Sequence, residues 1–246
     1  MTDASEYRLL CVFAHPDDES YGPGATLAQC ALDGVDVHIL MFTCGEAGSI
    51  GVSKEMPNDQ LCAARRVEMV AACEALGVKS HRILGVPDKG VAATDEDAAV
   101  AEILADIGRF RPQVVLTFHR EGVSSHPDHI AVTRFLDRAF LESGDEGPSR
   151  FYEWGIPQAR SHLYDRPNLK PMPDAEITAS VSPSSEAIEC KIAAIEAHVT
   201  QIEFYHWMQE RFDYRTGSVP EYFALRRVRG PHPDGVLGGL FEGVRP

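Results

Sequence analysis

The sequence predicts a Rossmann-like three-layer α/β sandwich with a mostly parallel sheet. Short apolar, β-branched runs alternate with longer segments whose apolar residues recur at helical spacing. This β–α–β rhythm is typical of parallel strands covered by helices on both faces. The chain has 246 residues, 44% hydrophobic and 24% charged, so it can build a core of normal size without disulfides. We therefore expect one domain over residues 1–246, with a Gly/Pro-rich tail from about residue 230.

The elements expected in the first 141 residues alternate regularly. The strands are apolar runs such as RLLCVF, VDVHILMFT and PQVVLTF, expected at residues 8–13, 35–43, 81–84 and 112–118. The helices carry amphipathic patterns, expected at residues 22–33, 58–76, 95–110 and 127–141. Gly34 and Gly77 follow two of these helices as C-caps, and Thr94 is expected to cap the helix at 95–110.

The second part of the chain is less regular. Additional strands are expected at residues 151–155, 176–181 and 222–228. Ser182 followed by Pro183 is a favourable helix start, so a helix is expected from there to about residue 212, with a break along it left open. The ending GPHPDGVLGGLFEGVRP predicts a loop or a tail that faces a partner.

Composition excludes some classes of function. The net charge of −14 argues against sequence-independent binding to nucleic acid or to an anionic membrane. No apolar run is long enough for a membrane span, and no signal peptide is evident, which predicts a cytoplasmic protein. The six cysteines form no CxxC pair, so a cysteine zinc site has no support and reduced thiols are expected.

Two polar clusters carry the chemistry. HPDDE begins directly after the strand at 8–13, and SSHPDH follows the strand at 112–118. Ligands in open α/β sheets bind beyond the carboxyl ends of the strands. If the two strands are neighbours, one patch gathers His15, Asp17, Asp18, His126, Asp128 and His129. Two histidines and a carboxylate suit zinc, which would also compensate the crowded negative charge.

These motifs resemble the LmbE-like, or PIG-L, family of zinc-dependent N-acetylglucosamine deacetylases. The resemblance extends to about residue 201 through AHPDDE at 14–19, TCGEAGS at 43–49, RRVE at 65–68, LGVPD at 84–88, HPDH at 126–129 and KIAAIEAHVTQ at 191–201. It implies a hydrolase in which metal-activated water removes the acetyl group from a small-molecule amino-sugar conjugate.

The resemblance also implies roles for individual residues. His15, Asp18 and His129 would ligate one Zn²⁺ per chain, although Fe²⁺ also suits such a set. Asp17 would be the general base, and His126 would stabilise the oxyanion. The proton transfers would fall to Asp17 alone or to Asp17 together with His126. Asp128 is implied as the partner that orients a histidine. The tentative substrate contacts are Glu46, Arg65, Arg66 and Asp88.

Departures from the family pattern leave alternatives open. Lys89 follows Asp88 where the family commonly places glycine, and serines precede His126. Both affect the pocket wall, so the substrate could instead be a larger amide such as a thiol conjugate. A non-catalytic module that binds a sugar or nucleotide is a further alternative, although no GxGxxG follows the first strand. A homo-oligomer is compatible with each of these interpretations.

Overall fold

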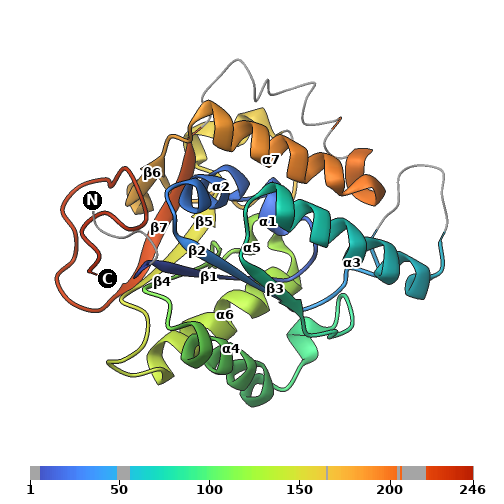
Figure 1. The fold of residues 1–246 in the computed structure, drawn as a ribbon, viewed down its shortest axis with the longest axis horizontal. Coiled ribbons are helices and arrows are strands. Elements are labelled where there is room, and N and C mark those ends of the chain that lie inside the picture. The colour runs from blue at the N-terminus through green and yellow to red at the C-terminus, as the bar shows by residue number, and fades with distance from the viewer. Residues whose placement is uncertain (1–5, 49–55, 165, 204–205, 207–219, 246) are drawn as a thin grey trace.

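The computed structural model describes residues 6–48, 56–164, 166–203, 206 and 220–245. In this part of the chain, one seven-stranded sheet has the order β3-β2-β1-β4-β5-β7-β6 (Figure 1). Its strands are β1 (Arg8–Phe13), β2 (Asp36–Met41), β3 (Ser80–Ile83), β4 (Val114–Phe118), β5 (Arg150–Gly155), β6 (Ala179–Val181) and β7 (Glu221–Val228).

The five strands from β3 to β5 run parallel, and the last two do not. β1 lies at the centre, with Leu10 opposite His38 of β2 on one side and Val115 of β4 on the other. β7 pairs antiparallel with β5, and β6 pairs antiparallel with β7. This arrangement confirms the predicted α/β class with a mostly parallel sheet.

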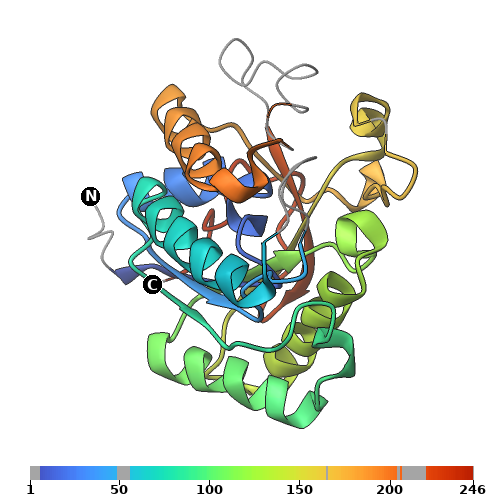
Figure 2. The same ribbon diagram turned by 90° about the vertical axis from the view of Figure 1, so that its right-hand side faces the viewer.

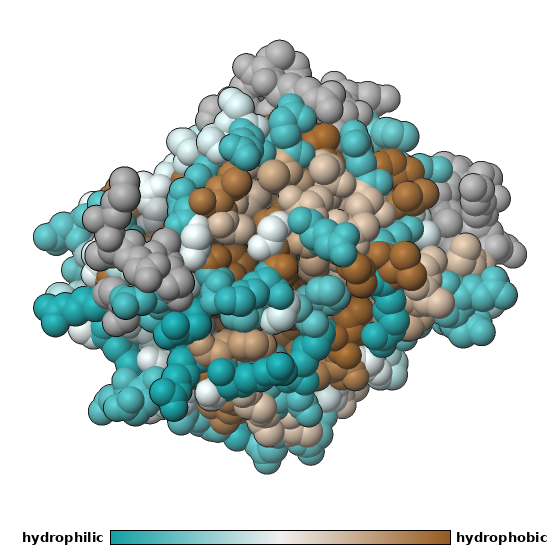
Figure 3. Space-filling model, viewed as in Figure 1, coloured by the Kyte–Doolittle hydropathy of each residue, from teal (hydrophilic) through white to brown (hydrophobic). Residues whose placement is uncertain are grey.

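Helices cover both faces of the sheet, as Figures 1 and 2 show. α2, α3 and α7 form one layer, and α4 and α6 form the other. The helices are α1 (Asp18–Tyr21), α2 (Gly24–Leu32), α3 (Asn58–Ala75), α4 (Glu96–Phe110), α5 (Gly122–Ser125), α6 (Pro127–Glu142) and α7 (Ser185–Ala197). In the space-filling view, apolar residues gather over the middle of the face, with hydrophilic residues around them (Figure 3).

The burial of the central strands explains why they stand out in the sequence as apolar runs. All five residues of β4 are buried, as are all but the first residue of β1. A strand that is covered on both faces reads as a continuous apolar run rather than an alternating one. Since β1 and β4 are parallel neighbours, the segments that follow their carboxyl ends emerge at the same edge.

Some boundaries differ from the expectation. The N-cap of α4 is Asp95, whose carboxylate accepts the Ala98 N–H at 2.9 Å, whereas the Thr94 hydroxyl donates to Gly90 O. The helix expected from 182 to about 212 is α7, which ends at Ala197, and a short 3-10 turn follows it. Most of that expected segment beyond residue 203 lies outside the described residues.

The Gly/Pro-rich tail packs on its own chain. Leu237 forms an isolated bridge with Ala179 of β6, and the two segments exchange backbone hydrogen bonds there. Leu240 and Val244 are buried, and the Tyr7 hydroxyl donates to the carbonyl of Val244. The described part of the tail is a loop, and Leu237, Leu240 and Val244 are buried against this chain.

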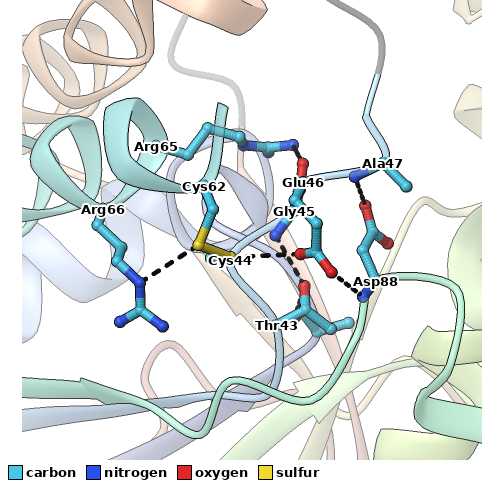
Figure 4. Close-up of a disulfide and its surroundings, with 10 residues drawn as sticks. Thr43, Cys44, Gly45, Glu46, Ala47, Cys62, Arg65, Arg66 and Asp88 are labelled. Atoms are coloured by element: carbon cyan, nitrogen blue, oxygen red, sulfur yellow. Dashed lines mark hydrogen bonds between the residues drawn. A yellow bond between two sulfur atoms is a disulfide. The ribbon is translucent and has the colours of Figure 1, made fainter. Parts of the chain in front are cut away.

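The expectation of reduced thiols is wrong for one pair of cysteines. Cys44 and Cys62 form a disulfide with their Cα atoms 5.1 Å apart. It joins the loop after β2 to the beginning of α3 (Figure 4). The other cysteines are free thiols, Cys11, Cys30, Cys73 and Cys190. The pairing depends on how α3 packs beside that loop, which no local pattern of cysteines reveals.

Candidate active site

The HPDDE and HPDH motifs meet at the carboxyl ends of β1 and β4. HPDDE turns directly from β1 into α1, and HPDH forms the start of α6. A cavity of about 420 Å³ opens between them, which is within the usual range for small-molecule sites. Its walls include five of the six residues that the two motifs were expected to bring together, namely His15, Asp17, Asp18, His126 and His129.

Three side chains converge with the spacing of metal ligands. His129 Nε2 lies 3.3 Å from His15 Nδ1 and 3.4 Å from Asp18 Oδ1. His15 Nδ1 lies 3.6 Å from Asp18 Oδ2. Tetrahedral zinc with bonds of 2.0–2.2 Å places neighbouring ligand atoms about 3.3–3.6 Å apart. The donor set therefore suits a zinc ion, with Asp18 facing His129 through Oδ1 and His15 through Oδ2.

The other nitrogen of each ring indicates which atom is available to a metal. His129 Nδ1 lies 3.2 Å from the carbonyl of Gly122, so Nδ1 carries the proton that it donates. His15 Nε2 lies 3.1 Å from Asp88 Oδ1 and 3.3 Å from Asp128 Oδ2, which assigns a proton to Nε2. In these tautomers His15 Nδ1 and His129 Nε2 direct lone pairs at one another, an arrangement that a cation between them stabilises.

The local charges also favour a cation. Burial alone would lower the pKa of His15, but Asp128, Asp18 and Asp88 outweigh it and raise the pKa to about 12. These carboxylates therefore stabilise positive charge beside His15, and a divalent cation can supply that charge in place of a proton. Burial lowers the pKa of His129 to about 4, which keeps its ring neutral, as a metal ligand must be.

Within the described residues, His15 belongs to two groups that could hold a metal. One group adds His126 and His129, and the other adds Asp88 and Asp128. The second group lies at His15 Nε2, where the two carboxylates accept the ring proton. His and Asp side chains that could hold a metal ion are thus gathered at this edge of the sheet.

Asp17 lies in the cavity wall in an unusual backbone conformation. Its φ of 104° is in the left-handed region, which non-glycine residues rarely adopt. Its Oδ2 accepts a hydrogen bond from Arg65 at 2.9 Å, and the same guanidinium donates to the carbonyls of Pro16 and Gly45. Burial raises the pKa of Asp17 to about 7, although the Arg65 charge opposes this shift.

His126 caps α6 and differs from His129 in its available atom. Its Nδ1 accepts the backbone N–H of Asp128 at 3.2 Å, and Pro127 occupies the first helical position. Because Nδ1 is the acceptor, the neutral ring carries its proton on Nε2. Burial and the nearby His15 lower the pKa of His126. This ring can therefore donate one hydrogen bond from Nε2 to a group in the cavity.

Asp128 lies beneath the site and does not line the cavity. It is fully buried, and its Oδ2 accepts from His15 Nε2 and from the backbone N–H of Lys89 at 2.8 Å. Its Oδ1 has no partner among the described residues. This geometry lets Asp128 fix the orientation of the His15 ring.

The four tentative substrate contacts separate into two pairs. Arg65 and Asp88 line the cavity, whereas Glu46 and Arg66 are not among its lining residues in the described part of the chain. Glu46 accepts the Asp88 N–H at 2.8 Å, and Arg66 Nε lies 3.4 Å from Cys62 Sγ (Figure 4). Asp88 Oδ2 in turn accepts the N–H of Ala47 at 3.0 Å.

Two buried groups behind the site form a pair that the sequence argument did not predict. Glu19 Oε1 lies 2.6 Å from His198 Nε2, and both side chains are wholly buried. Burial alone would lower the pKa of His198, but Glu19 raises it. Glu19 is part of AHPDDE and His198 is part of KIAAIEAHVTQ, but nothing indicated that they pair, because the two residues are 179 positions apart. Other lining residues without an assigned role include Trp154, Tyr164 and Leu169.

Comparisons with known proteins show the family to which the chain is related. A family described as PIG-L: GlcNAc-PI de-N-acetylase matches residues 10–140. A 1D-myo-inositol 2-acetamido-2-deoxy-alpha-D-glucopyranoside deacetylase of Acidothermus cellulolyticus is 34% identical, and the alignment covers 96% of this chain and 94% of that protein.

Solved structures share the fold. The 4-carboxy-2-hydroxymuconate hydratase GalB of Pseudomonas putida KT2440 has a TM-score of 0.70 at 18% identity, covering 92% of this chain and 99% of that one. The zinc-inhibited form of teicoplanin deacetylase Orf2 has a TM-score of 0.65 at 20% identity, covering 89% and 97%. At these identities the similarity shows the fold alone, and the same fold occurs in a hydratase as well as in a deacetylase.

Proposed function

The chain belongs to the PIG-L family of GlcNAc-PI de-N-acetylases and is an N-deacetylase, and we propose that it deacetylates N-acetylglucosamine linked to myo-inositol. The proposed substrate is the one named for the Acidothermus relative, whose similarity extends over nearly the whole of both chains. The cavity of about 420 Å³ has room for a compact conjugate of this kind.

The proposal depends most on the convergence of His15 Nδ1, Asp18 and His129 Nε2, which lie 3.3–3.6 Å apart. We assign these residues to one Zn²⁺ because two neutral imidazoles and a carboxylate leave a fourth position for water. A zinc ion held there would supply a Lewis acid that lowers the pKa of a bound water to about 7 and polarises the amide carbonyl.

The remaining chemistry falls to Asp17 and His126. Asp17 takes a proton from the water as its oxygen bonds to the amide carbon, and Arg65 fixes the orientation of the carboxylate meanwhile. His126 donates from Nε2 to the oxygen that gains negative charge. The proton held by Asp17 then passes to the sugar nitrogen as the C–N bond breaks, which releases acetate and the free amine.

The cavity wall offers groups for both halves of the conjugate. The ring of Trp154 and the side chain of Leu169 supply apolar surface, against which a sugar face can pack. Lys89, also in the wall, donates from Nζ to the carbonyl of Ala47 at 2.8 Å. We propose that Arg65 and Asp88 shape the cavity mainly through their contacts with Asp17 and His15.

The test is amine release from two substrates, the GlcNAc–inositol conjugate and free N-acetylglucosamine. We expect the conjugate to have the larger kcat/KM by about tenfold or more, because each added hydrogen bond to the aglycone is worth up to about 1.5 kcal/mol. Equal values for the two substrates would contradict a site for inositol. No amine release from either would overturn the proposed substrate class.

A further inference from the structure

The strained backbone of Asp17 requires support from its surroundings. With φ at 104° and ψ at −26°, Asp17 precedes α1 in a conformation that an L-residue keeps only when neighbouring groups enforce it. Its side chain is held by Arg65 at 2.9 Å. Its backbone N–H, in contrast, donates to Glu19 Oε2 at 3.0 Å.

Glu19 is held in turn by His198 and Ser20, neither of which is among the residues that line the cavity. Its Oε1 accepts from His198 Nε2 at 2.6 Å and from the Ser20 hydroxyl at 2.7 Å. The carboxylate therefore has one oxygen for the Asp17 backbone and the other for His198. A buried carboxylate with good donors on both oxygens is a rigid anchor, whereas one that loses a donor must move or change its protonation.

Within the part of the chain that the structure describes, Glu19 is the hydrogen-bond partner of the His198 ring. It is fully buried at the C-terminal end of α7, and its Nδ1 has no partner among the described residues. The bond to Glu19 thus accounts for its ring orientation. α7 belongs to the helix layer over α2 and α3, so His198 connects that layer to the turn that carries Asp17.

We propose that His198 is a positioning residue, which acts through Glu19 to hold the Asp17 backbone and thereby aim the Asp17 carboxylate into the cavity. The proposal rests on the proposed function for the role of Asp17. It assigns His198 no contact with substrate or metal. Its loss should therefore reduce kcat while leaving KM and the bound zinc nearly unchanged.

The test compares four variants in steady-state deacetylation. His198→Leu removes the hydrogen-bond donor, and the shorter side chain of His198→Asn does not reach Glu19. In both variants we expect kcat to fall about 10–100-fold, with KM within about threefold of the wild type. His198→Gln keeps a donor near the position of Nε2 and should recover most of kcat. Thr200→Val removes the hydroxyl bond to Glu68 in the same turn and should leave kcat within about twofold.

Hydrogen–deuterium exchange supplies a readout that does not need activity. We expect the peptide over residues 14–21 to lose protection in His198→Leu and His198→Asn, and to keep it in His198→Gln and Thr200→Val. Equal kcat and equal protection in His198→Gln and His198→Asn would overturn the proposal, even if His198→Leu does not fold. If the wild type releases no amine, the proposed function fails, but the exchange measurement still decides whether His198 holds the turn.

Discussion

The two histidines of HPDH, three positions apart, are suited to different tasks because their ring nitrogens meet different partners. His129 donates from Nδ1 to Gly122 O and leaves Nε2 for a metal. His126 accepts at Nδ1 from the Asp128 N–H and leaves a donor at Nε2. Sequence alone places both at the start of a helix, but the hydrogen bonds that distinguish them appear only with the turn that precedes α6.

Asp128→Asn tests the support of the metal site at the residue scale. Asn removes one of the two negative charges that stabilise the proton on His15 Nε2, so we expect the affinity for zinc to fall about 10–100-fold. Asp106→Asn is the matched control, because Asp106 is also buried but pairs with Arg82 away from the site. Competition with a zinc chelator measures both. Equal affinity in the Asp128 variant and the control would show that Asp128 does not support His15.

The same scale shows what local patterns can predict. Five residues of HPDDE and HPDH meet at one cavity because HPDDE follows β1 and HPDH follows β4 after the short α5, and β1 and β4 are neighbours. The pairs Cys44–Cys62 and Glu19–His198 were not predictable in this way. Each joins segments whose contact depends on helix packing, and neither has a spacing that carries chemical meaning.

At the scale of elements, the disulfide fixes the beginning of α3 to the loop after β2. Arg65 lies three residues after Cys62 on this helix and reaches Asp17, so the link lies close to the site (Figure 4). For cysteines separated by 18 positions, loop entropy predicts a loss of about 3 kcal/mol of unfolding free energy on reduction.

Denaturation with and without a thiol reductant measures this loss. The Cys44→Ala/Cys62→Ala double variant is the control, since reductant should not change its unfolding free energy. Thiol titration of unfolded protein kept from reductant should find the four free cysteines. Titration of all six cysteines would contradict the disulfide.

A buried ion pair connects α7 to β7, and its carboxylate also binds the start of α2. Lys191 Nζ lies 2.6 Å from Glu221 Oε1, and the Glu221 carboxylate also accepts the N–H groups of Ala25 and Thr26. Lys191→Met should cost about 3–5 kcal/mol, because it leaves a buried carboxylate without its cation. Lys79→Met removes an exposed pair with Asp36 and should cost about 1 kcal/mol or less. Denaturant unfolding compares the two, and similar losses would refute the distinction.

At the scale of the whole molecule, the tail after β7 covers the edge of the sheet at β6. Leu240→Ala should destabilise the protein by about 2–5 kcal/mol, because Leu240 is buried under its own chain. Val236→Ala, at a position 60% exposed, should change stability by about 0.5 kcal/mol or less. Thermal unfolding of both variants checks this. A Leu240 variant as stable as the Val236 variant would mean that the tail is not part of the core.

For the fold too, features set by local sequence patterns were predictable, and features set by tertiary packing were not. The layers were predictable because β1, β2 and β4 are buried runs separated by amphipathic helices, so period and burial agree. The packing of the tail and the early end of α7 were not. Gly and Pro in the tail indicate a loop but not what it covers, and the end of α7 coincides with the tertiary contact of His198. No helix of the described part is long and apolar enough to cross a membrane.

The most direct test of the account is zinc content measured together with deacetylation in the wild type, Asp17→Asn and His129→Ala. Asn retains an oxygen that can accept from Arg65 and tolerates the left-handed backbone. We predict about one zinc per chain in the wild type and in Asp17→Asn, a loss of activity of about 10²–10⁴-fold in Asp17→Asn, and little zinc in His129→Ala. A wild type that binds no zinc when zinc is offered, or an Asp17→Asn enzyme with undiminished kcat, would contradict the account.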